Sequence, residues 1–134
     1  MIPVLNKEST AQELADLCWL LNECRNFCED SNLKWKIARL SSNAEEVNES
    51  FLEGFNLLPL TVSNHYKEFS EKLTIEERTE SLLSFAFNSV AILDSGRFEE
   101  FEANKEFRTN IKAIRNETLH LLHEKKGWRN EEEE

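Results

Sequence analysis

The sequence predicts an all-α protein, an antiparallel bundle of four to five helices. Only three Gly and two Pro occur in 134 residues, too few for the frequent turns of an all-β chain. Apolar residues recur instead at spacings of three and four, which is the period of an amphipathic helix. A chain of this length buries roughly two thirds of its unfolded surface, so it needs no disulfide or structural metal to fold. We expect one all-helical domain over residues 1–128 and an acidic, disordered tail over residues 129–134.

Capping boxes mark the expected starts of the first helices. Residues 10–13 (Thr-Ala-Gln-Glu) form one, in which a hydroxyl and a carboxylate satisfy free backbone donors, and the helix behind it is expected to end at residues 30–32. The inward stripe of this helix consists of Leu14, Leu17, Cys18, Leu21, Cys24 and Cys28. Residues 33–40 predict a short helical piece. A second box at residues 42–45 predicts the start of a helix that Pro59 ends.

The rest of the chain predicts three further helical segments. Residues 60–73 have a weak helical pattern, because Thr, Val, Ser and Asn stand near its start. A third capping box at residues 74–77 precedes the most apolar helix, which ends at Asp, Ser and Gly in residues 94–96. The last segment, residues 98–126, has helical periodicity and is followed by Gly127 as a C-terminal stop.

The charge of the chain is unevenly distributed. The formal net charge is −10, from 26 acidic and 16 basic side chains, which excludes a protein that coats nucleic acid or anionic membrane with its whole surface. Residues 1–96 hold 8 basic and 16 acidic groups, and residues 131–134 are all Glu. Residues 97–130 hold 8 basic and 6 acidic groups. The part of the chain that holds the last helix is therefore mildly basic, which allows a focused nucleic-acid site on that helix.

The cysteines and the absence of apolar runs predict a cytoplasmic protein. Cys18, Cys24 and Cys28 lie in one short segment at helical spacing, and an odd number of cysteines gives no disulfide framework. We interpret them as reduced, mostly buried thiols. Residues 1–10 lack the pattern of a signal peptide, and no apolar stretch approaches the roughly 20 residues that cross a bilayer. We expect no membrane partner.

The final helix divides into an apolar face and a polar face. Side chains placed at about 100° per residue form a core-facing stripe of Phe107, Ile111, Ile114, Thr118, Leu121 and Leu122. The opposite side carries Lys105, Arg108, Lys112, Asn116, His120 and His123. Arg115 stands at the edge between the two faces. One surface with cations and imidazoles therefore runs along a helix of an otherwise acidic protein.

The run Arg115-Asn116-x-x-x-His120, preceded by an apolar residue near the end of a small helical domain, resembles the signature of the HEPN superfamily. Members of that family carry Arg, usually a polar residue next, and then His after four to six intervening residues. Many are metal-independent endoribonucleases that act as homodimers, with their two motifs facing each other across a cleft. They occur as toxins of toxin–antitoxin pairs, in phage defence and in CRISPR effectors, and others serve as inactive binding modules. The resemblance implies a HEPN-like fold, RNA as substrate, a homodimer and an antitoxin or other protein partner.

The residue types suit this chemistry. RNA supplies its own nucleophile, the 2′-hydroxyl, so cleavage needs no metal or cofactor but does need a proton-transfer group and a fixed cation. His120 fits as general base or acid, because an unperturbed imidazole titrates near 6.5. Arg115 can contact two phosphate oxygens and stays charged, and Asn116 can orient the imidazole or hold the substrate. Arg115 and His120 diverge by about 140° on an ideal helix, so helix bending, the reach of Arg or a second subunit must close the gap.

We expect Arg108, Lys112 and His123 to contact RNA beside this catalytic pair. The simplest alternative takes these side chains, and His120 with them, as solvated residues of a polar helix face. A second enzyme class is also open, because Glu at positions 46, 49, 77 and 80 resembles the paired acidic motifs of Mg²⁺-dependent all-α nucleoside triphosphate pyrophosphatases. The spacing of Glu117 and His120 matches one di-iron ligand pair, but the motif occurs once and such a site needs it twice.

A third class has no chemistry. Glu45, Glu49 and Glu53 repeat every four residues and give an acidic helix face. Such a face could bind a basic partner or mimic a phosphate backbone, as an antitoxin or a DNA mimic does. A protein of this class would not need a basic final helix, whereas a nuclease would.

Overall fold

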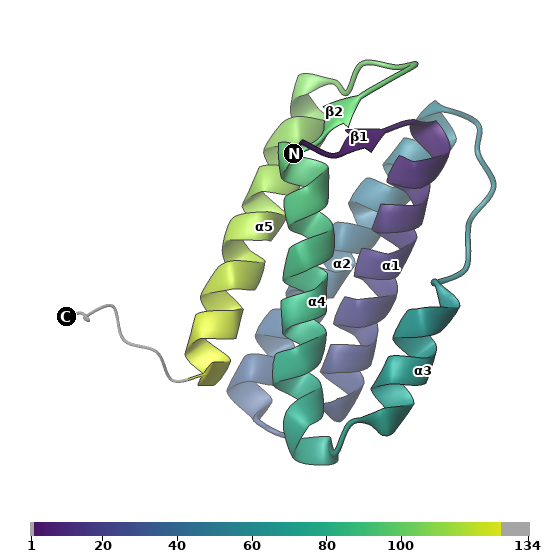
Figure 1. Cartoon of the computed structure of the whole chain (residues 1–134). Coiled ribbons are helices and arrows are strands. Elements are labelled where there is room, and N and C mark those ends of the chain that lie inside the picture. Colours follow the sequence, from purple (N-terminus) through teal and green to yellow (C-terminus); the bar gives the residue numbers. More distant parts are fainter. Residues whose placement is uncertain (1, 127–134) are drawn as a thin grey trace.

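The structure, a computed structural model, describes residues 2–126, and these form a bundle of helices (Figure 1). The helices are α1 (Lys7–Phe27), α2 (Ser31–Gly54), α3 (Asn64–Lys72), α4 (Ile75–Ser95) and α5 (Lys105–Lys126). Two short strands, β1 (Val4–Leu5) and β2 (Arg97–Phe98), pair in parallel at one end of the bundle. The predicted all-α class is confirmed. The expected stop at Gly127 and the acidic tail at 129–134 lie outside the described residues.

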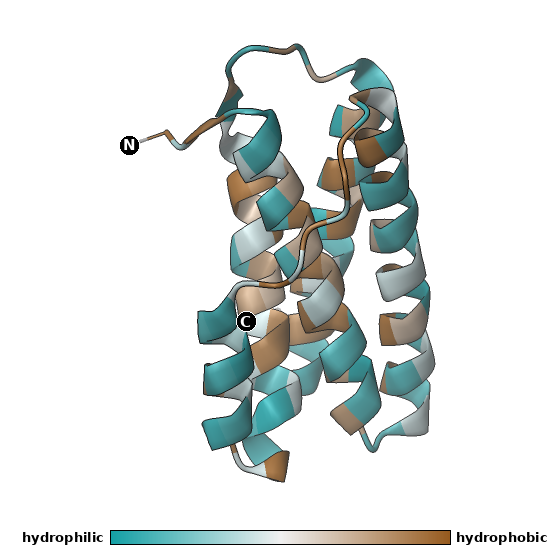
Figure 2. Ribbon diagram, turned by 90° about the vertical axis from the view of Figure 1, so that its right-hand side faces the viewer, coloured by the Kyte–Doolittle hydropathy of each residue, from teal (hydrophilic) through white to brown (hydrophobic). Residues whose placement is uncertain are grey.

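The four long helices pack so that each contacts two neighbours. α1 and α5 each contact both α2 and α4, and Figure 1 shows α1 and α5 running opposite to α2 and α4. The bundle is therefore antiparallel, with α1 and α5 on one diagonal. Hydrophobic residues face inward between the helices (Figure 2). The largest fully buried side chains include Leu14, Leu17, Leu20, Leu21, Ile37, Leu82, Leu83, Ile111 and Leu121.

The connection from α2 to α4 crosses the outside of α1. Asp16 of α1 accepts a hydrogen bond from the backbone N–H of Ser63 at 2.9 Å, and Gln12 Nε2 donates to the carbonyl oxygen of Thr61 at 2.9 Å. α3 follows, and the ring of Phe69 meets the ring of Phe85 on α4 edge to face, with centroids 4.8 Å apart. α3 thus lies on the outer surface of the bundle, shorter than the predicted segment 60–73.

The expected start of the first helix is wrong by one turn. α1 begins behind Asn6, whose side chain accepts from Ser9 N at 2.8 Å while Ser9 Oγ accepts from Asn6 N at 2.8 Å. Thr10 is instead buried within the helix. The reason is the β1–β2 pairing, because it holds Leu5 in a strand and places the extended Asn6 at the N-cap position.

The predicted break between residues 40 and 42 is also wrong, since α2 is continuous. Asp30 caps it by accepting from Asn32 N at 2.9 Å and Leu33 N at 3.1 Å, and Ser42 is an exposed mid-helix residue. α2 ends before Pro59. Asn56 adopts a φ of 54°, and the N–H of the next residue, Leu57, donates to the carbonyl oxygen of Leu52 at 2.8 Å. This left-handed C-terminal motif stops the helix without proline.

Both boundaries of α4 and the end of α5 at Lys126 are as predicted, but the start of α5 is not. Thr74 and Glu77 form the expected capping box, with Thr74 N donating to Glu77 Oε1 at 3.0 Å and Glu77 N donating to Thr74 Oγ1 at 3.3 Å. α4 ends at Ser95, before Gly96. The last helix begins at Lys105 and not near Phe98, because Phe98 pairs in β2 and the following loop contains Glu100 with a φ of 72°.

Candidate functional site

α5 carries the predicted motif and turns it outward. The side chain of Asn104 caps the helix by accepting from Phe107 N at 2.7 Å. The predicted inward stripe is confirmed, since Ile111, Ile114, Thr118, Leu121 and Leu122 are all buried and Phe107 is partly buried against the core. With this stripe fixed, Asn116 and His120 are exposed and His123 is half-buried.

Arg115 lies on the flank of α5 that faces α4. Its Nε lies 3.4 Å from Asp94 Oδ2 on α4, and its Nη1 donates to Asn116 Oδ1 at 3.3 Å. Its guanidinium carbon also lies 5.4 Å from the ring centroid of Phe87. The side chain keeps 36% of its surface exposed. Arg115 is thus held by three groups and can still be reached from solvent.

His120 lies on the other flank of the outward face. It follows Arg115 by five residues, which turns it about 140° around the helix axis. No hydrogen bond joins Arg115 to His120 among residues 2–126. Within one chain, therefore, the structure brings Arg115 next to Asn116 but does not bring His120 to the guanidinium.

The two cations expected to contact RNA are both exposed and both engaged within the chain. Lys112 Nζ lies 3.6 Å from Asp94 Oδ1, so a single carboxylate serves Lys112 and Arg115 together. Arg108 Nε donates to the carbonyl oxygen of Ala103 at 3.2 Å, and its guanidinium carbon lies 5.4 Å from the ring centroid of Phe98. The flank of α5 toward α4 thus holds two cations, Lys112 and Arg115, against Asp94, while Arg108 contacts a backbone carbonyl and an aromatic ring.

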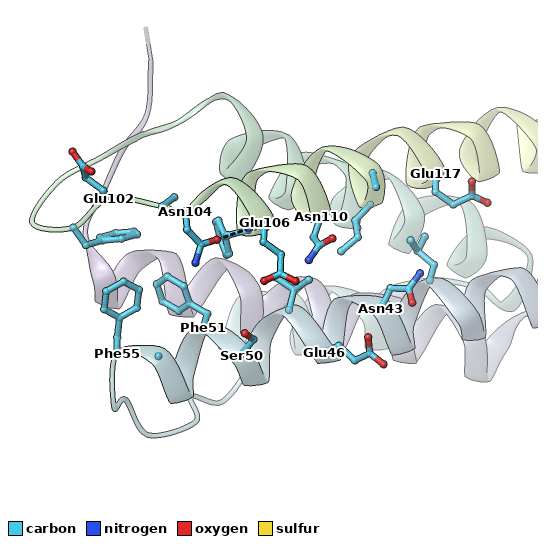
Figure 3. A pocket seen from close by; sticks show the side chains of 18 of the residues that line it. Asn43, Glu46, Ser50, Phe51, Phe55, Glu102, Asn104, Glu106, Asn110 and Glu117 are labelled. Carbon is cyan, nitrogen blue, oxygen red and sulfur yellow. Dashed lines mark hydrogen bonds between the residues drawn. The ribbon is translucent and has the colours of Figure 1, made fainter.

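A groove of about 760 Å³ lies between α2 and α5 (Figure 3). Phe51, Phe55, Phe101 and Phe107 line one end of it. The polar residues of the lining are Arg39, Asn43, Glu46, Ser50, Glu102, Asn104, Glu106, Asn110 and Glu117. Neither Arg115 nor His120 is among its lining residues. The groove was not predicted, because the sequence does not say which helices face each other. The sequence feature that could have indicated it is the set of short polar or small residues on the facing sides of α2 and α5.

The carboxylates of the alternative magnesium site serve different parts of the fold. Glu46 lines the groove between α2 and α5, whereas Glu77 caps the start of α4. The hydrogen bonds from Thr74 hold the pKa of the Glu77 carboxyl below its usual value. Within residues 2–126, no group of three or more His, Cys, Asp or Glu side chains is placed to hold a metal ion.

Two carboxylates of α1 near the start of α3, the buried Asp16 and the half-buried Glu13, were also missed by the sequence patterns. Asp16 is 4% exposed and accepts from both the backbone N and the Oγ of Ser63. Burial, and then the nearby charge of Asp16, raise the pKa of Glu13. The sequence shows these residues only as part of an amphipathic helix, because Ser63, the partner of Asp16, lies 47 positions away.

The three cysteines are free thiols, as predicted. Cys24 and Cys28 are buried and Cys18 is half-buried. Burial, followed by the charges of Glu45 and Glu49, raises the pKa of Cys18 to about 12, and burial likewise raises the pKa of Cys24. Since the thiolate is the reactive form, these two thiols are poor nucleophiles.

Comparisons of the chain with models of protein families, with curated proteins and with solved structures find no significant match. No helix within residues 2–126 has both the length and the apolar character that a bilayer crossing requires.

Proposed function

We propose that the protein is a metal-independent endoribonuclease that acts as a homodimer, with Arg115 and His120 as its catalytic pair and Asn116 in support. The observation that carries the proposal is the outward placement of the motif on α5. Asn116 and His120 are exposed, and Arg115 is held by Asp94 while 36% of its surface stays open. A cation positioned in advance is what a developing phosphorane charge requires, because no reorganisation is then needed during the reaction.

The geometry of α5 supports the homodimer in this proposal. Arg115 and His120 point to different flanks of one helix, so a phosphate held by Arg115 of one chain is better reached by an imidazole from a second copy. Two copies also supply two imidazoles. One neutral His120 takes the proton of the 2′-hydroxyl, and the protonated His120 of the second copy gives a proton to the leaving 5′-oxygen.

The reaction then balances without a metal. The 2′-oxygen bonds to phosphorus, the bond from phosphorus to the 5′-oxygen breaks, and the products carry a 2′,3′-cyclic phosphate and a 5′-hydroxyl. Arg108 and Lys112 lie on the same helix as Arg115 and extend its positive charge along the RNA backbone. We expect such an enzyme to act in the cytoplasm, as a toxin or phage-defence nuclease with an inhibitory protein partner.

The test is cleavage of single-stranded RNA by the full chain in the presence of EDTA. We expect cyclic phosphate ends, and a loss of about 100-fold or more in rate for His120→Ala and for Arg115→Ala. His65→Ala is the matched control, since His65 is an exposed histidine on α3. No cleavage by the wild type, or equal cleavage by His120→Ala, would overturn the catalytic proposal and favour the non-catalytic binding module.

A further inference from the structure

The groove between α2 and α5 has two chemically different halves. At one end the rings of Phe51, Phe55 and Phe101 pack with centroids 4.9 to 5.6 Å apart, and Phe107 completes the cluster at 5.4 Å from Phe51. Away from this end polar side chains join the lining, among them Glu46, Glu106, Asn110 and Glu117, beside the apolar Leu40, Val47, Ala113 and Ile114. Figure 3 shows Glu106 and Asn110 reaching from α5 toward α2. A ligand that fills the groove must therefore be apolar at one end and polar along its length.

The polar half carries more carboxylates than cations, and in the described part of the chain its carboxylates form no ion pair with Arg39. Among residues 2–126, no basic side chain lies within ion-pair distance of Glu46, Glu106 or Glu117. Arg39 is the one basic residue in the lining, and its guanidinium carbon lies 5.0 Å from the ring centroid of Trp35 on the same helix. The carboxylates thus present their charge to whatever enters, and a cationic ligand is favoured.

The dimensions of the groove match a short extended peptide. Its α2 wall runs from Arg39 to Gly54, which is about 22 Å at the rise of an α-helix and equals the span of six or seven extended residues. Beyond Arg39, an ion pair between Lys36 Nζ and Glu124 Oε1, 3.2 Å apart, connects α2 to α5. Asn43, Ser50 and Asn110 add amide and hydroxyl groups along the walls, which suit the backbone of an extended peptide.

We propose that this groove binds a basic, amphipathic segment of a partner protein, with an apolar side chain at the phenylalanine end and Lys or Arg along the carboxylates. The acidic residues 131–134 of this chain have the wrong charge to occupy it. RNA is disfavoured for the same reason, so the groove and the outward face of α5 take different partners. A charge-matched peptide is the ligand that uses both halves of the groove.

The experiment measures binding of a labelled seven-residue peptide to the full chain by fluorescence anisotropy. The probe has Trp at one end followed by Lys alternating with Ala. We expect micromolar affinity that falls with salt. Replacing the Trp by Ala should weaken binding by about tenfold or more. Replacing the Lys by Glu should abolish it. Spermine, which carries the charge without the apolar end, should compete poorly.

Two pairs of variants locate the site. Glu46→Gln with Glu106→Gln should weaken binding about tenfold, whereas Glu45→Gln with Glu49→Gln removes the same charge from residues outside the groove lining and should change it less than twofold. Ala113→Phe places a ring in the groove and should block the peptide, while Thr109→Phe, on the same helix but outside the lining, should not.

Each outcome decides the proposal. Absence of peptide binding, equal binding of the probe without Trp, effective competition by spermine, or equal effects of the two glutamate pairs would overturn it. Because Arg115 and His120 do not line the groove, the RNA-cleavage assay and the peptide assay can fail separately.

Discussion

Arg115 and Asp94 join the motif helix α5 to α4, with Arg115 Nε 3.4 Å from Asp94 Oδ2. The carboxylate is largely buried, at 17% exposure, and it also takes Lys112. A group that orients the predicted phosphate-binding cation is therefore also a structural contact between two helices of the bundle.

Replacement of this carboxylate tests both roles. Asp94→Asn should lower the free energy of unfolding by about 1 kcal/mol, because both ion pairs are lost from a partly exposed site. It should also slow RNA cleavage, since Arg115 loses its fixed orientation. Urea unfolding and single-turnover cleavage measure the two effects. Glu99→Gln, which breaks the far more exposed pair with Arg97, should leave both unchanged, and an equal loss in the two variants would contradict the structural role.

The carboxyl of Glu13 predicts an unusual pH dependence of stability. Its pKa is raised in the folded state by burial and by Asp16, so folding favours the protonated form and wild-type stability falls as the pH rises from about 4.5 through the folded value. Glu13→Gln removes that cost. We expect the variant to have the higher melting temperature at pH 7, and the difference to vanish below about pH 4.5 in thermal scans across pH.

Glu77→Gln provides the control with the opposite sign. The folded pKa of Glu77 is lowered by its hydrogen bonds from Thr74, so its contribution is present at neutral pH and is lost as the pH falls through the folded value. The variant should be less stable than the wild type at pH 7 and equal to it at low pH. If stability changed with pH in the same way in Glu13→Gln and Glu77→Gln, burial would not be what raises the pKa of Glu13.

The cysteines should resist modification in the native protein. Burial raises the pKa of both Cys18 and Cys24, so little thiolate is present at pH 8 and reagents have poor access. Iodoacetamide followed by peptide mass spectrometry should find these two residues unmodified in the native protein and fully modified in guanidinium. Rapid labelling of Cys24 before unfolding would contradict the burial of α1.

Two glycines should respond to alanine in opposite ways. A Cβ at Gly96 would lie 2.8 Å from the carbonyl oxygen of Ile92 and 2.9 Å from Leu5 Cδ1, whereas a Cβ at Gly54 meets nothing within 4 Å. Gly96→Ala should cost about 1–3 kcal/mol of unfolding free energy by overpacking the junction of α4 and β2. Gly54→Ala should gain up to about 1 kcal/mol, because alanine is the better helix former. Chemical denaturation measures both, and similar losses would refute the close approach at Gly96.

The sequence was sufficient where local chemistry decides the structure. The capping box at Thr74 and Glu77 needs only residues three apart, and the inward stripe of α5 needs only helical period, so both are confirmed. The start of α1 could not be predicted, since it depends on β1 pairing with β2 more than 90 positions later. Thr10 begins a Thr-x-x-Glu pattern and Asn6 an Asn-x-x-Ser pattern, and the pairing of β1 with β2 places the helix start at Asn6.

The candidate site was likewise predicted only where local sequence determines it. The outward exposure of Asn116 and His120 follows from helical period alone, and the sequence predicted it. The ion pair of Arg115 with Asp94 and the groove between α2 and α5 depend on which helices are neighbours, and that information is in the packing. Whether His120 acts on RNA stays a prediction.

The position of α1 within the bundle constrains how the chain can fold during synthesis. α1 is synthesised before the elements that cover it, namely α2, the crossover with α3, and α4, and β1 is synthesised before its partner strand β2. The nascent α1–α2 hairpin therefore exposes the faces that will bury Leu14, Leu21 and Leu40. The core closes only when Leu121 and Leu122 have been translated, and until then the apolar faces of the earlier helices are open to aggregation.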